Sequence, residues 1–367
     1  MKISVTKEDL SNGLQSVQNV VGTRSTLPIL SNVLLVASEN KLELRATDLE
    51  VSIHARVPAK VEREGASTIP ARRIFGLVRE IEATEIEIEI NDKEIATVKA
   101  GGASYKLHGI GAEEYPPEAK FKESGKIKLP QAKLREMLKK TAYAVSTDES
   151  RHTLNGINFI AEPERITLVA TDGRRLALVE EELEEGTKGQ FIMPTKSVTE
   201  LQRILQGEGE VEVSISETHA ELKVAQEKGE HIKIHSKLVE GNFPNYKQVI
   251  PKESKQRIPV IREELLHALR RADQITSDKA NSVKLKFADN TLSITANTPE
   301  VGSGNENLAI QYTGPEIEVA FNPVYLMEPL KILEGDEIFV ELTDNLSPGV
   351  IKSNTPFLYV LMPMRTN

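Results

Sequence analysis

A threefold internal repeat constrains the fold of this chain more than any other feature. Three segments with one pattern, a short apolar strand that leads into a helix, begin at residues 3, 127 and 258: ISVTKEDLSNGLQSVQNVV, IKLPQAKLREMLKKTAYAV and IPVIREELLHALRRADQI. Their leucines and valines recur at the three- and four-residue spacing of one helix face. Because internal periodicity of this kind reflects a repeated structural unit, the chain is predicted to hold three copies of one domain.

Two further segments recur in the same order in each copy. One set is KLELRATDLEVSIHARV, RITLVATDGRRLALVEEEL and TLSITANTPEVGSGNENLAI, and the other is STIPARRIFGLVREI, QFIMPTKSVTELQRIL and EVAFNPVYLMEPLKIL. The register is constant, since Pro70 and Pro194 are separated by the same 124 residues as Leu10 and Leu134. Each copy is therefore predicted to contain a strand, a helix, a pair of strands, a strand, a second helix and a run of further strands.

Segments rich in proline, glycine and charge separate the three copies. They are GAEEYPPEAKFKESGK at residues 111–126 and GNFPNYKQVIPKESKQR at residues 241–257, and such segments are typical of linkers. The strictly alternating EIEIEIND and VEVSISET indicate half-buried strands. We therefore predict three α+β domains, at residues 1–120, 126–250 and 251–367, each with two helices and much antiparallel sheet.

Composition points to a cytoplasmic protein without a membrane partner. The chain has no cysteine, which excludes disulfides and thiolate metal sites and agrees with a reducing compartment. No apolar run approaches the ~20 residues that span a bilayer. The N-terminal MKISVTKEDL enters an alternating pattern at once and lacks the apolar block of a secretory signal.

The distribution of charge along the chain says more about a polyanionic partner than the net charge does. The net charge is −9, but the predicted helices at 6–20, 71–80, 130–142, 195–205, 262–272 and 322–333 together carry +6, which leaves −15 for the rest. Equivalent helices of repeated domains should share a face, and a positive face attracts a polyanion such as duplex DNA. Surface helices also carry Lys and Arg for solubility alone, so both interpretations stay open. The candidate side chains are Arg72, Arg73, Arg79, Lys133, Arg135, Lys139, Lys140, Lys196, Arg203, Arg270 and Arg271.

Signatures of catalysis are missing from the sequence. The glycine stretches GEGE at 207 and GSG at 302 lack the helix and lysine of a phosphate loop. His231 and His235 are the only close histidine pair, and their spacing along a strand argues against a shared metal. Glu85, Glu87 and Glu89 indicate a solvated strand face rather than a general acid and base. We expect a protein that is not an enzyme and has no catalytic residue, cofactor or metal.

Several motifs together carry a resemblance to a known family. They are RSTLPILSNVLL at 24, TDLE at 47, LNGI at 154, ATDGRRLA at 170, SKLVEGNFPNYKQVIP at 236 and YVLMPMR at 359. In this order, and across the whole chain, they resemble the bacterial sliding clamps, the beta subunits of DNA polymerase III. The resemblance implies a head-to-tail homodimeric ring of clamp domains, with helices lining the hole and antiparallel sheets outside. A nucleotidyltransferase or nuclease, and a scaffold that does not bind DNA, are the alternatives.

The resemblance also implies a function and a set of DNA contacts. Such a ring encircles double-stranded DNA without reading its sequence and tethers the replicative polymerase as a processivity factor, in the cytoplasm and at the nucleoid. Arg24 and the loop STDESRHTLNG match family contacts, although the family has two tyrosines where this chain has His152 and Thr153. The DNA-binding residues implied are Arg24, Arg72, Arg73, Arg79, Lys133, Lys139, Lys140, Arg151, His152, Lys196 and Arg203.

At the joint between two chains, the resemblance places Tyr105 and Leu107 against Gln274 and Ile275 of the other chain. From the residues alone, the first two are equally well explained as alternating core residues of an edge strand. An open edge strand is itself an association site unless it is covered.

A pocket between the second and third domains is the remaining implied site. It receives a peptide with a glutamine and a Leu-Phe pair from the DNA polymerase III alpha subunit, the clamp loader and other proteins with this motif. From the residues alone, the terminal part is an ordinary final strand. Asp48 and Asp172 are predicted to fix equivalent turns, while the two arginines after Gly173 are specific to the second copy and are predicted to grip the peptide. The pocket residues are Leu154, Thr171, Gly173, Arg174, Arg175, Leu176, Pro244, Gln248, Val249, Val360, Met362, Pro363, Met364 and Arg365.

Overall fold

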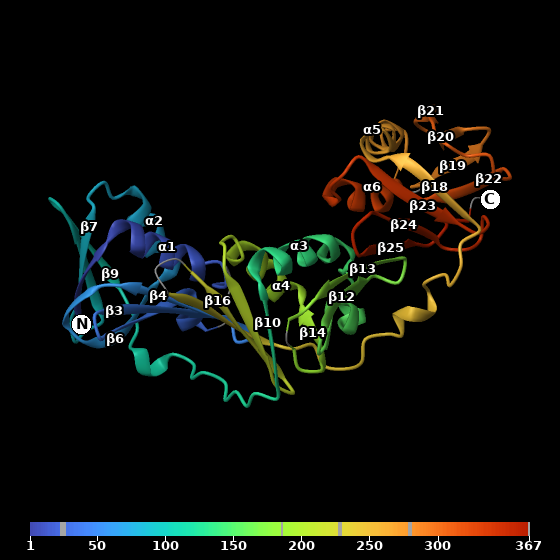
Figure 1. Cartoon of the computed structure of the whole chain (residues 1–367). Coiled ribbons are helices and arrows are strands. Elements are labelled where there is room, and N and C mark those ends of the chain that lie inside the picture. Colours follow the sequence, from blue (N-terminus) through green and yellow to red (C-terminus); the bar gives the residue numbers. More distant parts are fainter. Residues whose placement is uncertain (23–26, 185, 227–229, 278–280, 366–367) are drawn as a thin grey trace. The chain divides into compact units, whose positions relative to one another are not determined.

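The computed structural model describes residues 1–22, 27–184, 186–226, 230–277 and 281–365 (Figure 1). The chain divides into two compact units. The first comprises residues 1–135, 184–189 and 196–238, and the second comprises residues 136–183, 190–195 and 239–367. Arg24 lies outside the described residues. No helix of the described residues is long and apolar enough to cross a membrane.

Apart from β5 in the first, the three repeats have the same order of helices and strands. The first is β1(Lys2–Thr6), α1(Lys7–Val17), β2(Asn32–Ser38), β3(Lys41–Thr47), β4(Val51–Pro58), β5(Lys60–Arg63), β6(Gly65–Pro70), α2(Ala71–Glu80), β7(Glu85–Ile90), β8(Ile95–Ala100) and β9(Ala103–His108). The second is β10(Gly125–Pro130), α3(Gln131–Thr141), β11(Gly156–Glu162), β12(Arg165–Thr171), β13(Arg175–Glu182), β14(Gly189–Pro194), α4(Thr195–Ile204), β15(Glu210–Ile215), β16(His219–Ala225) and β17(His231–Lys237). The third is β18(Gln256–Ile261), α5(Arg262–Asp273), β19(Val283–Ala288), β20(Thr291–Thr298), β21(Gly302–Ala309), β22(Ile317–Phe321), α6(Pro323–Ile332), β23(Glu337–Leu342), β24(Gly349–Lys352) and β25(Phe357–Leu361).

The six predicted helices are confirmed to within three residues at either end. The predicted strand order lacks β2, β11 and β19, which precede the predicted pair in each repeat, and it also lacks the short β5 of the first repeat. The reason is clearest for β2 and β11, because four consecutive residues of each are buried. A strand that is covered on both faces has no polar alternation to reveal it.

The first unit contains two antiparallel sheets. One has the order β5-β1-β7-β8-β9, and the other has the order β10-β15-β16-β17-β4-β3-β2-β6. In the larger sheet, β17 of the central repeat pairs with β4 of the first repeat, with Ile234 opposite Ile53. Helix α1 packs against β3, β4 and α2 through a buried stripe of Leu10, Leu14 and Val17.

The second unit is built in the same way. Its sheets have the orders β14-β11-β12-β13-β25-β24-β23-β18 and β21-β20-β19-β22. Strand β13 of the central repeat pairs with β25 of the third repeat, with Leu176 opposite Val360. Helices α5 and α6 pack against each other, as the orange and red part of Figure 1 shows. The compact units therefore divide the central repeat, because its strands join the sheets of both neighbours.

The acidic strand β7 has the predicted one-sided burial. Ile86, Ile88 and Ile90 are buried, whereas two of the alternate glutamates form ion pairs with residues of β8 and β5. Glu87 Oε1 lies 3.4 Å from Lys99 Nζ, and Glu89 Oε1 lies 3.4 Å from Arg63 Nη2. These carboxylates thus belong to an outward face on which charges alternate in sign.

Candidate partner-binding site and basic helices

The turn between β12 and β13 is held by the side chain of Asp172. Its Oδ1 accepts hydrogen bonds from the backbone N–H groups of Arg174 (2.8 Å) and Arg175 (3.0 Å). Asp48 does the same in the first repeat, where Oδ1 accepts from the N–H groups two and three residues later at 3.0 and 2.8 Å. The prediction that both aspartates fix a turn is confirmed, and the shared geometry follows from Asx-type bonding.

Both turns need one residue with positive φ, directly after the aspartate. Gly173 has φ +85° and Leu49, at the equivalent place, has φ +77°. Glycine adopts this conformation without strain, whereas leucine does not. In the second copy, the glycine also lets Arg151 approach, since a Cβ on Gly173 would lie 3.0 Å from Arg151 Nη1.

The two arginines of this turn have different environments. Arg174 is exposed, while Arg175 is buried. The Arg175 guanidinium forms ion pairs with Asp172 (Nε to Oδ2, 3.0 Å) and with Glu328 of α6, and its Nη2 donates to the backbone oxygen of Tyr143 at 2.6 Å. It also lies 4.2 Å from the ring centroid of Tyr325. The guanidinium of Arg175 is therefore bonded to internal partners, and only Arg174 presents its side chain to solvent.

An apolar cluster lies beneath this turn. Its buried members are Leu154, Val169, Leu176, Ile192, Phe243 and Val360. Tyr246, Val249 and Ile250 are partly buried and pack against it. The structure thus brings together Leu154, Leu176, Val249 and Val360, which are spread over residues 154–360. The pairing of β13 with β25 places Leu176 opposite Val360.

A recess with a volume of about 340 Å³ opens beside this cluster. Ile160, Leu178, Tyr246 and Ile250 belong both to its lining and to the partly buried rim of the cluster. Charged residues, among them Arg165 and Glu180, complete its wall. Sequence reasoning missed this hollow and its lining, although Tyr246 lies inside the quoted motif that contains Pro244 and Gln248.

The C-terminal segment runs beside the turn. Met362 N–H donates to Arg174 O at 2.9 Å, and Met364 N–H donates to Ala320 O at 2.8 Å. Met362 and Pro363 are half-buried, while Met364 and Arg365 are exposed. Pro244 and Gln248 are also exposed, on the segment that carries Val249.

Arg151 lies at the same turn, although sequence reasoning grouped it with the DNA contacts. Its Nη1 donates to Asp172 O at 3.1 Å. His152, the other loop residue predicted to contact DNA, is exposed, and a Cβ on Gly241 would lie 3.9 Å from its Nε2. Arg151 is thus hydrogen-bonded to the turn between β12 and β13, a contact that the sequence pattern could not reveal.

The predicted basic side chains of the helices differ in how accessible they are. Arg72, Arg73, Arg79, Arg135, Lys139 and Arg270 are exposed, and Lys133 is half-buried. Across the described ranges, no ion pair involves Arg73, Lys139 or Arg270. Arg271, in contrast, forms a two-point ion pair with Glu306 at 2.7 and 2.8 Å. Exposed cations without a carboxylate partner remain available to an external anion.

Three predicted DNA contacts form ion pairs with carboxylates of the same chain. Lys140 is buried and forms an ion pair with Glu136, so we remove it from the candidate surface. Lys196 forms an ion pair with Asp48, and burial lowers the pKa of its ammonium group. Arg203 Nη1 lies 3.2 Å from Glu200 Oε1, and burial raises the pKa of that carboxyl group. A count of charges by helix could not reveal these pairs.

The predicted joint residues lie at the edges of two sheets. Strand β9, with Tyr105 and Leu107, is the last strand of its sheet, and β21 is the last strand of another. Tyr105 is 48% exposed, so the reading of it as a core residue is wrong for the isolated chain. Directly after α5, Gln274 is exposed and Ile275 is half-buried. The Ile275 side chain lies beside Gly304 of β21, since a Cβ added to Gly304 would be 3.5 Å from Ile275 Cγ1.

Family models of the DNA polymerase III beta subunit match the chain along nearly its whole length. The N-terminal domain model matches residues 1–119, the central domain model residues 128–245 and the C-terminal domain model residues 247–365. The chain belongs to the DNA polymerase III beta subunit family. Its fold is accordingly three tandem clamp domains, each with the strand and helix order described above.

Relatives of this family match over full length. The beta sliding clamp of Chlamydia muridarum is 34% identical, with 100% of this chain and 99% of that protein covered. The beta sliding clamp of Escherichia coli (strain K12) is 34% identical, with both chains covered completely. Among solved structures, the beta subunit of Pseudomonas aeruginosa has a TM-score of 0.94 at 30% identity, and the sliding clamp of Bartonella birtlesii bound to griselimycin has 0.93 at 32%. Both structures are covered at 100%, as is this chain.

Proposed function

We propose that this protein is a sliding clamp, which encircles duplex DNA and tethers the replicative DNA polymerase as a non-catalytic processivity factor. The single observation that carries the proposal is the complete match to clamps of known structure, with a TM-score of 0.94 over 100% of both chains. We place the three clamp domains at residues 1–120, 126–250 and 251–367, and the protein in the cytoplasm at the nucleoid.

Two open sheet edges support a head-to-tail ring. Strand β9 ends one sheet of the first unit and β21 ends one sheet of the second. Edge strands present unpaired backbone groups, and pairing one edge with the other on a second chain satisfies both. Tyr105 and Leu107 on β9 then contact Gln274 and Ile275 of the second chain. The solution mass of the protein tests this arrangement, because a stable monomer would contradict it.

Contact with DNA rests on exposed cations of the helices. Arg73 and Lys139, together with Arg72 and Arg79, are exposed and available to phosphates, and we propose that they contact the DNA backbone without reading its sequence. A closed ring is retained by topology, so weak and water-mediated contacts are sufficient and permit sliding. Retention on circular DNA that is lost when the circle is linearised is the expected result. Equal retention on linear DNA would refute encirclement, and it is the outcome expected of a nuclease or an ordinary DNA-binding protein.

The apolar cluster and its turn form the proposed docking site for partner peptides. Leu154, Leu176, Val249 and Val360 supply an apolar floor, the half-buried Met362 adapts to the bound side chain, and exposed Arg174 orients the peptide backbone. The polymerase alpha subunit and the clamp loader are the expected partners. A peptide with a glutamine and a Leu-Phe pair should bind the full chain in a calorimetric titration, and Arg174→Ala should weaken that binding.

The matched control for this experiment is Glu50→Ala. Glu50 is exposed and occupies the position in the first-repeat turn that Arg174 occupies in the second. Removing the Glu50 side chain therefore tests whether altering such a turn changes peptide binding by itself. We expect Glu50→Ala to bind the peptide as the unaltered protein does. If both variants bind normally, the assignment of Arg174 is wrong, while the ring and the DNA proposal are unaffected.

A further inference from the structure

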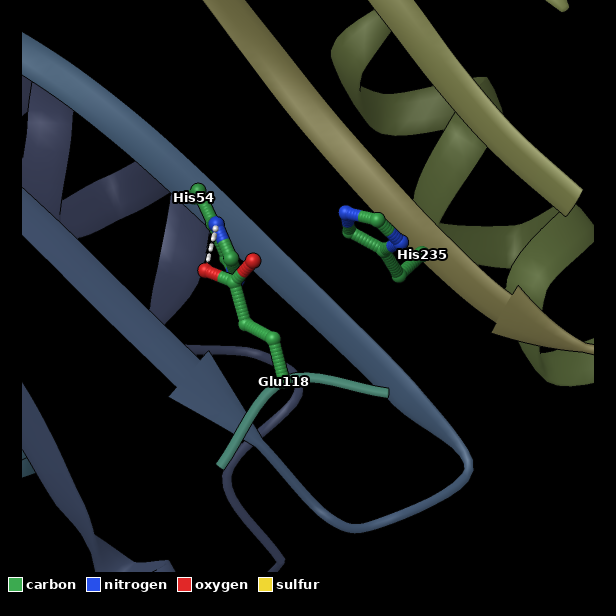
Figure 2. Close-up of side chains that lie close together, drawn as sticks. All are labelled: His54, Glu118 and His235. Atoms are coloured by element: carbon green, nitrogen blue, oxygen red, sulfur yellow. Dashed lines mark ion pairs between the residues drawn. The ribbon is translucent and has the colours of Figure 1, made fainter. Parts of the chain in front are cut away.

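A polar cluster occupies one face of the sheet where the first and central repeats join. His54 lies on β4 and His235 on β17, and these strands are hydrogen-bonded neighbours. Glu118 comes from residues 111–124, here called the joining segment, which connects the two repeats. Figure 2 shows the Glu118 carboxylate beside His54, with the His235 ring facing them from the next strand. His54 Nδ1 lies 3.3 Å from Glu118 Oε1.

Other contacts hold the joining segment across this face. The hydroxyl of Tyr115 donates to the backbone oxygen of Arg45 on β3 at 3.1 Å. The Phe121 ring meets the His235 ring edge-on at a centroid distance of 6.2 Å. Glu123 accepts a hydrogen bond from Ser214 of β15 at 2.6 Å. The segment is therefore fixed on both sides of Glu118, so the carboxylate is positioned before any ligand arrives.

The donor atoms have the spacing of a chelating site. One ligand atom from each of His54, Glu118 and His235 lies within 4.8 Å of the other two. Zinc bonds of about 2.0–2.1 Å in a tetrahedral arrangement place neighbouring donors roughly 3.3–3.4 Å apart. The His54–Glu118 distance of 3.3 Å already satisfies this spacing. The donor atoms lie at most 4.8 Å apart, so the longest donor–donor distance has to shorten by no more than about 1.4 Å to reach the zinc spacing. Rotation of the Glu118 side chain, which is 45% exposed, and of the His235 ring can provide this change.

Both imidazoles are largely removed from solvent. His54 is 7% exposed, the His235 side chain is 13% exposed, and the centroids of the two rings are 5.5 Å apart. Nε2 of His235 is buried and already has a partner among the described residues. Glu221 Oε2 lies 2.9 Å from that nitrogen and adds negative charge beside it.

The surrounding charges decide which cation fits. Arg45 Nη1 lies 2.7 Å from the same Glu118 oxygen that faces His54, and Arg45 also pairs with Glu43. An incoming cation must displace Arg45 from Glu118, after which the guanidinium retains Glu43. Magnesium and calcium require several oxygen ligands, which this cluster does not offer. Imidazole nitrogens with one carboxylate suit zinc and similar transition-metal ions.

We propose that His54, Glu118 and His235 together bind one zinc ion, which fastens the joining segment to the β4–β17 seam. The ion would connect three segments that are distant in the sequence, and its binding would stabilise the folded chain by an amount that rises with the logarithm of its free concentration once this exceeds the Kd. The sequence pattern had paired His235 with His231, which lies four residues along the same strand, whereas its ligand partners come from β4 and the joining segment. The proposal is independent of the clamp function.

Metal titration of the full-length, untagged chain tests the proposal. After removal of metal with a chelator, Zn²⁺ is titrated in competition with a chromophoric chelator, and Co²⁺ is added separately as a spectroscopic probe. We expect one Zn²⁺ per chain, the visible absorption of tetrahedral Co²⁺, and no comparable binding of Mg²⁺. Loss of one ligand, in His235→Gln or Glu118→Gln, should weaken Zn²⁺ binding by at least about tenfold and remove the Co²⁺ bands.

The matched control is His231→Gln, on the same strand as His235 but exposed and outside the ligand group. It should bind Zn²⁺ as tightly as the unaltered chain. Equal affinity in all variants, or no ion bound with Zn²⁺ in molar excess, would overturn the proposal. Circular dichroism monitors folding, and if His235→Gln fails to fold, Glu118→Gln decides the question, because Glu118 lies on the joining segment outside the β-strands.

Discussion

Replacing Arg175 by methionine should destabilise the protein far more than the same change at Arg174. Arg175 is nine-tenths buried among Asp172, Glu328 and the Tyr325 ring. Removing one partner of a buried ion pair costs roughly 3–5 kcal/mol, because the remaining charge is left without compensation. The Asp172 and Glu328 side chains are 15% and 25% exposed. Because water partly solvates them, we expect the free energy of unfolding to fall by about 3 kcal/mol, the lower end of this range. Methionine keeps the apolar stem, so lost packing contributes little.

Urea unfolding followed by circular dichroism measures this difference. Arg174→Met is the matched control, since Arg174 is adjacent and exposed, and its unfolding midpoint should stay close to that of the unaltered protein. Adding Glu328→Gln to Arg175→Met should recover part of the loss, because the second change removes the unpaired carboxylate. Equal midpoints for Arg174→Met and Arg175→Met would refute the internal role of Arg175 and restore the prediction that both arginines grip the peptide.

Three further outcomes are expected. Leu49→Gly should raise the free energy of unfolding by about 0.5–1 kcal/mol. The backbone at φ +77° strains leucine by roughly 1–2 kcal/mol, and the greater flexibility of glycine in the unfolded chain offsets part of the gain. A lower melting temperature than that of the unaltered protein would contradict this. Arg73→Glu combined with Lys139→Glu should shorten retention on circular DNA, most at low salt because added ions screen the contacts, whereas the exposed Lys93→Glu control should not. Deleting residues 363–367 should abolish peptide binding in a calorimetric titration, because Pro363, Met364 and Arg365 belong to the proposed docking site. The solution mass should still be that of a dimer, since the deletion removes no residue of the predicted joint.

Local patterns predicted much of each repeat. The six helices were located by their apolar spacing, and β7 by its alternating isoleucines, because periods of 3.6 and 2 residues report directly which face of an element is buried. Asp172 was predicted to fix a turn from its residue type alone, since a short acidic side chain reaches its own backbone. The same reasoning failed for β2 and β11, which are covered on both faces and therefore have no periodicity to detect.

The sequence by itself determined the repeated unit, its helices, its turns and the family to which the chain is similar. Only the tertiary structure decided which strand edges of neighbouring repeats pair, and hence that β17 meets β4 and β13 meets β25. Those pairings bury Arg175 and gather His54, Glu118 and His235 at one seam, and the tertiary structure also places Arg151 at the Asp172 turn. The physical reason is that hydrophobic periodicity is a local property, whereas burial and ion pairing depend on which distant segments become neighbours.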